Sequence, residues 1–94
     1  MRHARPADLD PLGDLLEGLR SVPGLRERTP GNFARGSEAF LHFHVDPSGL
    51  FADLKVDGAF ERFRVTTRRE QERFLARTRR AAGSPPRVSR PRTS

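Results

Sequence analysis

Apolar and polar residues alternate strictly along the middle of the chain, over residues 38–45, 50–56 and 59–65. Successive side chains of a β-strand point to opposite faces of the sheet, so each run predicts a strand with one apolar face. Asp46-Pro47-Ser48-Gly49 separates the first two runs, and Asp57-Gly58 separates the last two. Both segments are typical of turns between antiparallel strands. The pattern therefore predicts an antiparallel meander.

The two turns also predict the register of the meander. A four-residue loop places Val45 opposite Leu50, and a two-residue loop places Val56 opposite Ala59. A slip of one residue would exchange the two faces of the sheet and bury charged side chains, so the register is strongly specified. We expect the core on the face that carries Leu41, Phe43, Val45, Leu50, Ala52, Leu54, Val56, Phe63 and Val65.

Leucines at helical spacing precede the meander, at positions 12, 15, 16 and 19. They predict a helix over residues 10–21, which Asp10 can cap and Pro11 can begin. Residues 25–31 are expected to form a loop or one short strand. Residues 32–35 are a candidate fourth strand, paired through a turn at Gly36-Ser37 that would place Phe33 beside Phe40.

A second helix is expected after the meander. Thr67 and Glu70 form a capping box, in which each side chain accepts a hydrogen bond from the backbone amide of the other residue. This helix is predicted over residues 68–82, with Phe74 facing the sheet. Residues 84–94 combine proline and arginine with almost no apolar side chain, so we expect a disordered basic tail.

Together these elements predict one α+β domain over residues 1–83. A three- to four-stranded antiparallel meander sheet would pack an N-terminal and a C-terminal helix on one face. The absence of cysteine excludes disulfides and cysteine-based zinc sites. No apolar run approaches the roughly 18 residues of a membrane span. We therefore expect a cytoplasmic protein that does not associate with membranes.

The formal net charge of +6 is unevenly distributed. Residues 1–67 carry a net charge of −1, whereas residues 68–94 carry +7. The positive charge therefore belongs to the last helix and the tail, which are a candidate nucleic-acid interface. The simpler interpretation is a solvated helix face. The candidate contacts on the helix are Arg69, Arg73, Arg77 and Arg80.

The face of the meander opposite the core, which we call the open face, mixes aromatic, acidic and basic side chains. In the predicted register three rows cross the strands: Phe40–Lys55–Phe60, His42–Asp53–Arg62 and His44–Phe51–Arg64. Cations beside aromatic rings are typical of sites for anionic or planar ligands. An apolar patch of this kind also suits a homodimer or a protein partner. These nine residues are the predicted ligand-binding set.

The spacing of His42 and His44 can chelate a metal ion, with Asp53 as a third ligand. Arg62 and Arg64 would repel the cation, so the simpler interpretation is an Asp53–Arg62 pair with His42 hydrogen-bonded beside it. His42 and Asp53 are also a conceivable general acid–base pair. The sequence contains no recognisable nucleophile–base arrangement, and we assign no catalytic residue, metal or cofactor.

The run from Ala39 to His44, followed by Asp46, Gly49-Leu50 and Ala52-Asp53-Leu54, resembles the so-called luciferase domain, a family of small bacterial proteins of unknown function. Val22-Pro23-Gly24-Leu25 corresponds to the segment that precedes the family's strand. The layout is also similar to that of small α+β proteins of the MmcQ/YjbR-like group, some of which have been suggested to bind DNA. The resemblance implies a fold rather than an activity.

The function predicted from the sequence is a small binding or protein-interaction module that uses the open face, rather than an enzyme. The first alternative is a nucleic-acid-associated protein that binds through the C-terminal helix and tail. The second is a small metal-dependent or acid–base enzyme at His42, His44 and Asp53.

Overall fold

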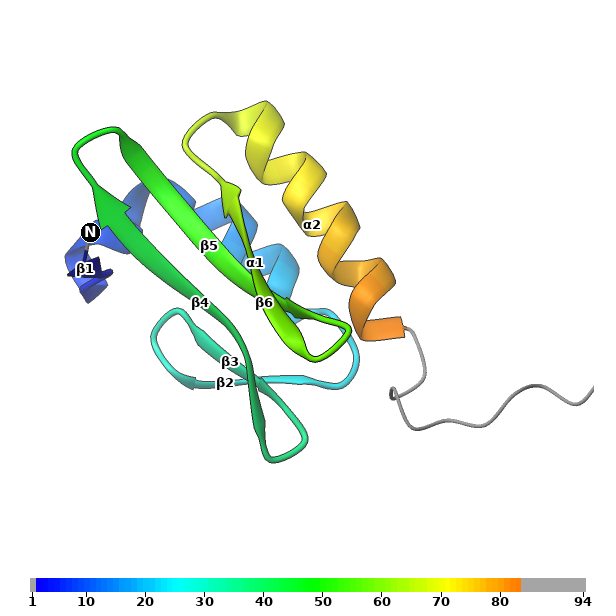
Figure 1. The fold of residues 1–94 in the computed structure, drawn as a ribbon. Coiled ribbons are helices and arrows are strands. Elements are labelled where there is room, and N and C mark those ends of the chain that lie inside the picture. The colour runs from blue at the N-terminus through cyan, green and yellow to red at the C-terminus, as the bar shows by residue number, and fades with distance from the viewer. Residues whose placement is uncertain (1, 84–94) are drawn as a thin grey trace, which may run out of the picture.

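Six strands form one antiparallel sheet in the computed structural model, which describes residues 2–83 (Figure 1). The predicted tail over residues 84–94 lies outside the described residues. Along the chain the elements are β1 (Arg2–His3), the 3-10 helix η1 (Pro6–Leu12), α1 (Gly13–Arg20), β2 (Leu25–Thr29), β3 (Asn32–Arg35), β4 (Glu38–Asp46), β5 (Gly49–Val56), β6 (Ala59–Arg64) and α2 (Arg68–Gly83). The predicted α+β class is confirmed, and both helical segments cover one face of the sheet (Figure 1).

The predicted meander is present, and both of its registers are confirmed. Val45 lies opposite Leu50 in the pair β4–β5, and Val56 lies opposite Ala59 in the pair β5–β6. The turn between β5 and β6 needs two residues in the left-handed region of backbone space. Asp57 and Gly58 adopt φ values of 53° and 86° there, which is the geometry that this dipeptide favours in hairpins.

The sheet extends beyond the meander on the side of β4, where β3 and β2 are added. The sheet order is β2-β3-β4-β5-β6, so the candidate strand over residues 32–35 is confirmed and residues 25–29 form a strand rather than a loop. The remaining strand, β1, was not predicted. It pairs with the far half of β4, placing Arg2 opposite Val45 and His3 opposite His44. Since β5 occupies the other edge of β4 at these positions, β1 and β3 share one edge.

The N-terminal helical segment begins earlier than predicted. A 3-10 helix over Pro6–Leu12 precedes the α-helix, so Asp10 and Pro11 lie inside the helical segment and do not cap its start. Asp8 takes the capping role instead, because its Oδ2 accepts a hydrogen bond from the backbone amide of Arg5 (2.8 Å). The leucine stripe nevertheless faces the core as expected, with Leu12, Leu15, Leu16 and Leu19 buried.

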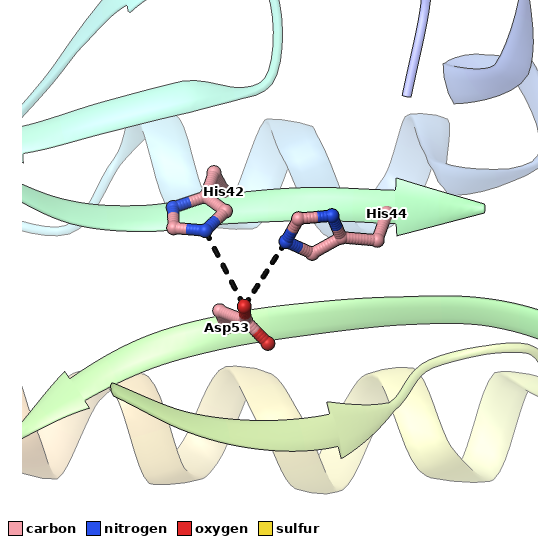
Figure 2. A group of neighbouring side chains, drawn as sticks. All are labelled: His42, His44 and Asp53. Atoms are coloured by element: carbon pink, nitrogen blue, oxygen red, sulfur yellow. Dashed lines mark hydrogen bonds and ion pairs between the residues drawn. The ribbon is translucent and has the colours of Figure 1, made fainter. Parts of the chain in front are cut away.

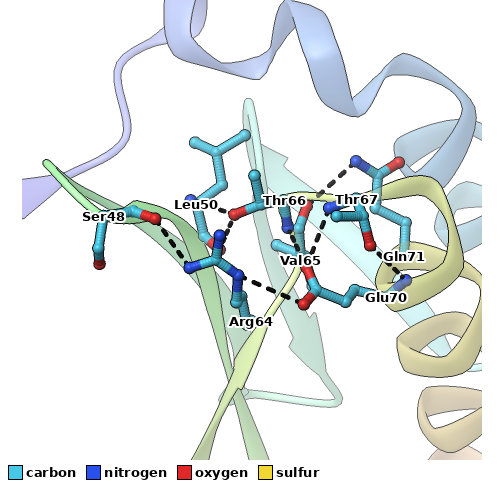
Figure 3. Close-up of polar contacts among 8 residues, drawn as sticks. All are labelled: Ser48, Leu50, Arg64, Val65, Thr66, Thr67, Glu70 and Gln71. Atoms are coloured by element: carbon cyan, nitrogen blue, oxygen red, sulfur yellow. Dashed lines mark hydrogen bonds and ion pairs between the residues drawn. The ribbon is translucent and has the colours of Figure 1, made fainter.

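The C-terminal helix begins where the capping box predicts (Figure 3). The amide of Glu70 donates to Oγ1 of Thr67 (3.1 Å), and the amide of Thr67 donates to Oε1 of Glu70 (2.9 Å). Phe74 on the inner side of α2 is 2% exposed. α1 approaches α2 closely at Gly18, where a Cβ would lie 2.6 Å from Cδ2 of Leu75. This glycine weakens an isolated helix, but it permits the contact between the two helices.

A β-bulge in β4 overturns the prediction that Phe40 lies on the open face. The pairing of β3 with β4 shifts by one residue, so that Ala34 faces Ala39 but Phe33 faces Leu41 rather than Phe40. The extra residue in a bulge re-aims its side chain. Phe40 and Leu41 are consequently both buried, at 4% and 1% exposure, and both belong to the core cluster. Strict alternation fails at this point because it assumes a regular ladder.

The alternation pattern predicts Phe40 and Phe60 on the same face of the sheet. Because of the bulge, we expect their replacement by alanine to have very different effects on stability. Phe40→Ala should destabilise the domain by about 3–5 kcal/mol, because it leaves a cavity in the core. Phe60→Ala should cost about 1 kcal/mol or less, because Phe60 is 42% exposed. Urea denaturation of the two variants measures both values. Equal losses would contradict the burial of Phe40.

Candidate functional site

The open face brings together two histidines and an aspartate (Figure 2). β4 presents His42 and His44 at alternate positions, and β5 presents Asp53 opposite His42. Nε2 of His44 lies 3.0 Å from Oδ2 of Asp53, and Nε2 of His42 lies 3.4 Å from the same oxygen. The two imidazole rings meet edge to face, with centroids 4.9 Å apart. Both rings therefore aim a nitrogen at one carboxylate oxygen.

Arg62 on β6 holds this carboxylate from the next strand. Its Nε donates to Oδ1 of Asp53 (2.8 Å) and its Nη2 donates to Oδ2 (3.0 Å), which makes a two-pronged, charge-assisted contact. Asp53 itself is 8% exposed. The hydrogen bonds from Arg62 lower the pKa of Asp53 despite the opposing effect of burial, and the neighbouring His44 lowers it further. Asp53 is therefore ionised at neutral pH.

His42 has the opposite preference, for its uncharged form. Burial lowers the pKa of His42, and the nearby rings of His44 and His3 lower it further, while the charge of Asp53 partly opposes them. An uncharged imidazole and an ionised carboxylate are the protonation states in which these side chains ligate metal ions. Three ligand atoms, one each from His42, His44 and Asp53, lie within 4.8 Å of one another.

His3 joins the same cluster and was missed by the sequence analysis. The pairing of β1 with β4 sets the His3 ring 4.7 Å from that of His44 and 5.6 Å from that of His42, measured between centroids. A strand of two residues has no alternation to detect, and both of its side chains are polar. The sequence offered one signal for this residue: His3 is the one histidine of the chain that lies outside the predicted strands.

No protein-family model, curated protein or solved structure matches this chain. The resemblance to the luciferase domain and to the MmcQ/YjbR-like group therefore stays a prediction, as do a homodimer or protein partner on the open face and a location in the cytoplasm. No helix within residues 2–83 is long and apolar enough to cross a bilayer.

The cations predicted to attract an anionic ligand each have a partner within the protein. Nζ of Lys55 lies 3.3 Å from Oε1 of Glu38, and Arg62 holds Asp53. Nη1 of Arg64 donates to the carbonyl of Ser48 (2.8 Å), and its Nε lies 3.3 Å from Oε2 of Glu70 (Figure 3). Arg64 thus ties the β4–β5 turn to the start of α2. The positive charge of the open face is largely compensated.

The predicted aromatic border of the open face is reduced to two rings. Phe40 lies in the core, while Phe51 is half-buried beneath the guanidinium of Arg64, with 5.9 Å between Cζ and the ring centroid. Phe60 remains exposed, and its ring centroid lies 4.9 Å from that of His42. Phe60 is therefore the aromatic ring of the predicted set that borders the histidine cluster directly.

The arginine stripe lies on the side of α2 away from the sheet. Phe74 and Thr78 are buried on the inner side, whereas Arg69, Arg73 and Arg80 are exposed and Arg77 is half-buried. Within residues 2–83, no ion pair or hydrogen bond involves the side chains of Arg69, Arg73 or Arg77, unlike the cations of the open face.

The Asp53 carboxylate should stabilise the domain in a pH-dependent manner. At neutral pH, Asp53→Asn should cost about 1–3 kcal/mol, because the substitution weakens the charged hydrogen bonds of Arg62 and His44. The folded pKa of Asp53 is lowered from the unfolded value of about 3.9. Its contribution is therefore complete above about pH 4 and disappears as the pH falls through the folded pKa.

Urea denaturation of the wild type and Asp53→Asn at pH 7 and at pH 3 measures this difference. The gap in stability between the two proteins should be narrower at pH 3 than at pH 7. Glu61→Gln, an exposed change on β6, should leave stability nearly unaltered at both values. A gap of constant size would contradict the assignment.

Proposed function

We propose that this domain is a small metal-binding module whose site is formed by His42, His44 and Asp53 on the open face. The observation that carries the proposal is the convergence of their ligand atoms within 4.8 Å of one another. Two imidazoles and one carboxylate suit divalent transition metals such as Zn²⁺, Co²⁺ or Ni²⁺. The hard cations Mg²⁺ and Ca²⁺ prefer sites made of oxygen ligands.

The protonation states of the site favour such an ion. Asp53 is charged and His42 is uncharged at neutral pH, so neither of these two side chains has to lose a proton before it binds the ion. Arg62 can hold the ligand Asp53 without contacting the metal itself. Its Nε–Oδ1 hydrogen bond can persist while Oδ2 of Asp53 binds the ion. Outer hydrogen bonds of this kind orient ligating carboxylates.

Arg62 also sets a limit on affinity. The positive charge of Arg62 cancels the negative charge of Asp53, so a divalent ion enters a site with no net charge. The ion is then stabilised by its bonds to the ligand atoms alone. Sites of three uncharged imidazoles, as in carbonic anhydrase, show that zinc does not require anionic ligands. Repulsion by Arg62 is therefore expected to weaken binding without preventing it.

A nucleic-acid-binding surface on α2 is the second candidate function. The observation that favours it is the contrast between the cations of the open face, which have acidic partners, and Arg69, Arg73 and Arg77, which have none within residues 2–83. Phosphate groups can relieve the repulsion between arginines on one helix face by neutralising their charge.

Metal binding should depend on the three ligands and not on other carboxylates of the sheet. The metal-free protein should bind Co²⁺ or Zn²⁺, and the d–d absorption of Co²⁺ or the heat of binding measures the affinity. His42→Ala and His44→Ala should each weaken binding at least about 100-fold, since losing even an outer partner of a ligand costs about 10–100-fold. Glu61→Gln is the matched control and should bind as the wild type does. No binding by the wild type would overturn the proposal.

Nucleic-acid binding through α2 should respond to position and not to net charge alone. Replacing Arg73 and Arg77 together by glutamate should weaken binding to single- or double-stranded DNA and reduce its salt dependence by about two phosphate contacts. The control replaces Arg26 and Arg28 of β2 by glutamate. This variant has the same net charge, but the change lies at the far edge of the sheet. Equal losses for the two double variants, measured by fluorescence anisotropy, would argue against an interface on α2.

A further inference from the structure

The position of His3 depends on where β3 ends. β3 pairs with β4 only as far as Leu41, which leaves the remaining edge of β4 available to β1. The ladder places His3 directly opposite His44, and directly opposed residues in an antiparallel pair have their side chains on the same face. His3 therefore lies on the open face, over the two histidines of β4.

Few contacts hold β1 in this position. Besides the pairing of Arg2 and His3 with β4, the amide of Ala4 donates to the carbonyl of Phe43 (3.1 Å), and Nη1 of Arg2 lies 2.8 Å from Oδ2 of Asp8. The residues of β1 are exposed, and no apolar side chain in the strand anchors it. The three imidazole rings are thus the most specific feature of the contact between β1 and β4.

The spacing of these rings matches that of imidazoles around one metal ion. Zinc binds imidazole nitrogens at about 2.0–2.1 Å, so the ring centroids of tetrahedrally arranged ligands lie about 5 Å apart. The three centroid distances here are 4.7, 4.9 and 5.6 Å. In its present orientation His3 is not part of the group within 4.8 Å. Because the ring is exposed, it can rotate about its side-chain bonds to present a nitrogen to that group.

We propose that His3 is a third imidazole ligand of the metal site, so that a bound ion joins β1, β4 and β5 and holds the N-terminal strand on the sheet. This inference rests on the proposed function, because it concerns the same ion. With His3 the site has four protein ligands, which is the number found in closed tetrahedral zinc sites. Metal binding and docking of β1 are then coupled, so that each stabilises the other.

Two variants of β1 separate ligation by His3 from simple docking of the strand. His3→Ala should weaken Zn²⁺ and Co²⁺ binding at least about 10-fold, and less than His42→Ala does. Arg2→Gln removes the contact with Asp8 and keeps the imidazole, so it should weaken binding much less. Hydrogen exchange provides an independent measurement: metal should slow exchange of the Ala4 amide, which bonds Phe43, in the wild type but not in His3→Ala.

The outcomes distinguish this inference from the proposed function. If the wild type binds neither Zn²⁺ nor Co²⁺, both fail. If the wild type binds and His42→Ala does not, the site is supported. An unchanged affinity in His3→Ala would then overturn the role of His3 alone. If Arg2→Gln weakens binding as much as His3→Ala, His3 acts through docking of the strand, and its assignment as a ligand is also overturned.

Discussion

The register that joins β4 to β5 and β6 is the constraint on which both faces of the sheet depend. It places Leu41, Leu54 and Ala52 against the helices, and in the same step it sets Asp53 between the histidines of β4 and Arg62 of β6. A slip of one residue would put the ion pair into the core and the apolar residues into solvent. The burial of apolar side chains in the core supplies the free energy that opposes a slip of register. The core therefore also fixes the relative positions of the side chains on the open face.

The parts of the fold that the sequence predicts well are those whose signals are local and periodic. Two turns with strong residue preferences determine the meander, and the capping box determines the start of α2. Phe40 was placed on the wrong face because a bulge changes the period by one residue, and no local signal marks it. β1 was missed for a different reason: it consists of two polar residues that form a strand only because β3 leaves an edge of β4 free. The third histidine of the cluster was missed with it.

The electrostatics of the open face also differ from what the composition suggests. Lys55, Arg62 and Arg64 do share the face, but each contacts an acidic side chain, so the sheet offers little uncompensated positive charge to an anion. Sequence position identifies which cations are neighbours. Their pairing depends on the reach of two acidic side chains, Glu38 at the start of β4 and Glu70 in α2. The features that remain distinctive are the imidazoles and the carboxylate that they share.

That shared carboxylate supports the proposed metal ion, because the contacts around it do not satisfy all three side chains. Oδ2 of Asp53 accepts a hydrogen bond from Arg62, and in the tautomer with a proton on Nε2 of His44 it accepts one from His44 as well, which uses both lone pairs of the oxygen. His42 directs its Nε2 at the same oxygen from 3.4 Å, and burial keeps this ring uncharged. The oxygen therefore has no lone pair left for a proton from His42, and an Nε2 without a proton would face it lone pair to lone pair. A cation that displaced the contact of His44 with Oδ2 would accept a lone pair from each of the three groups.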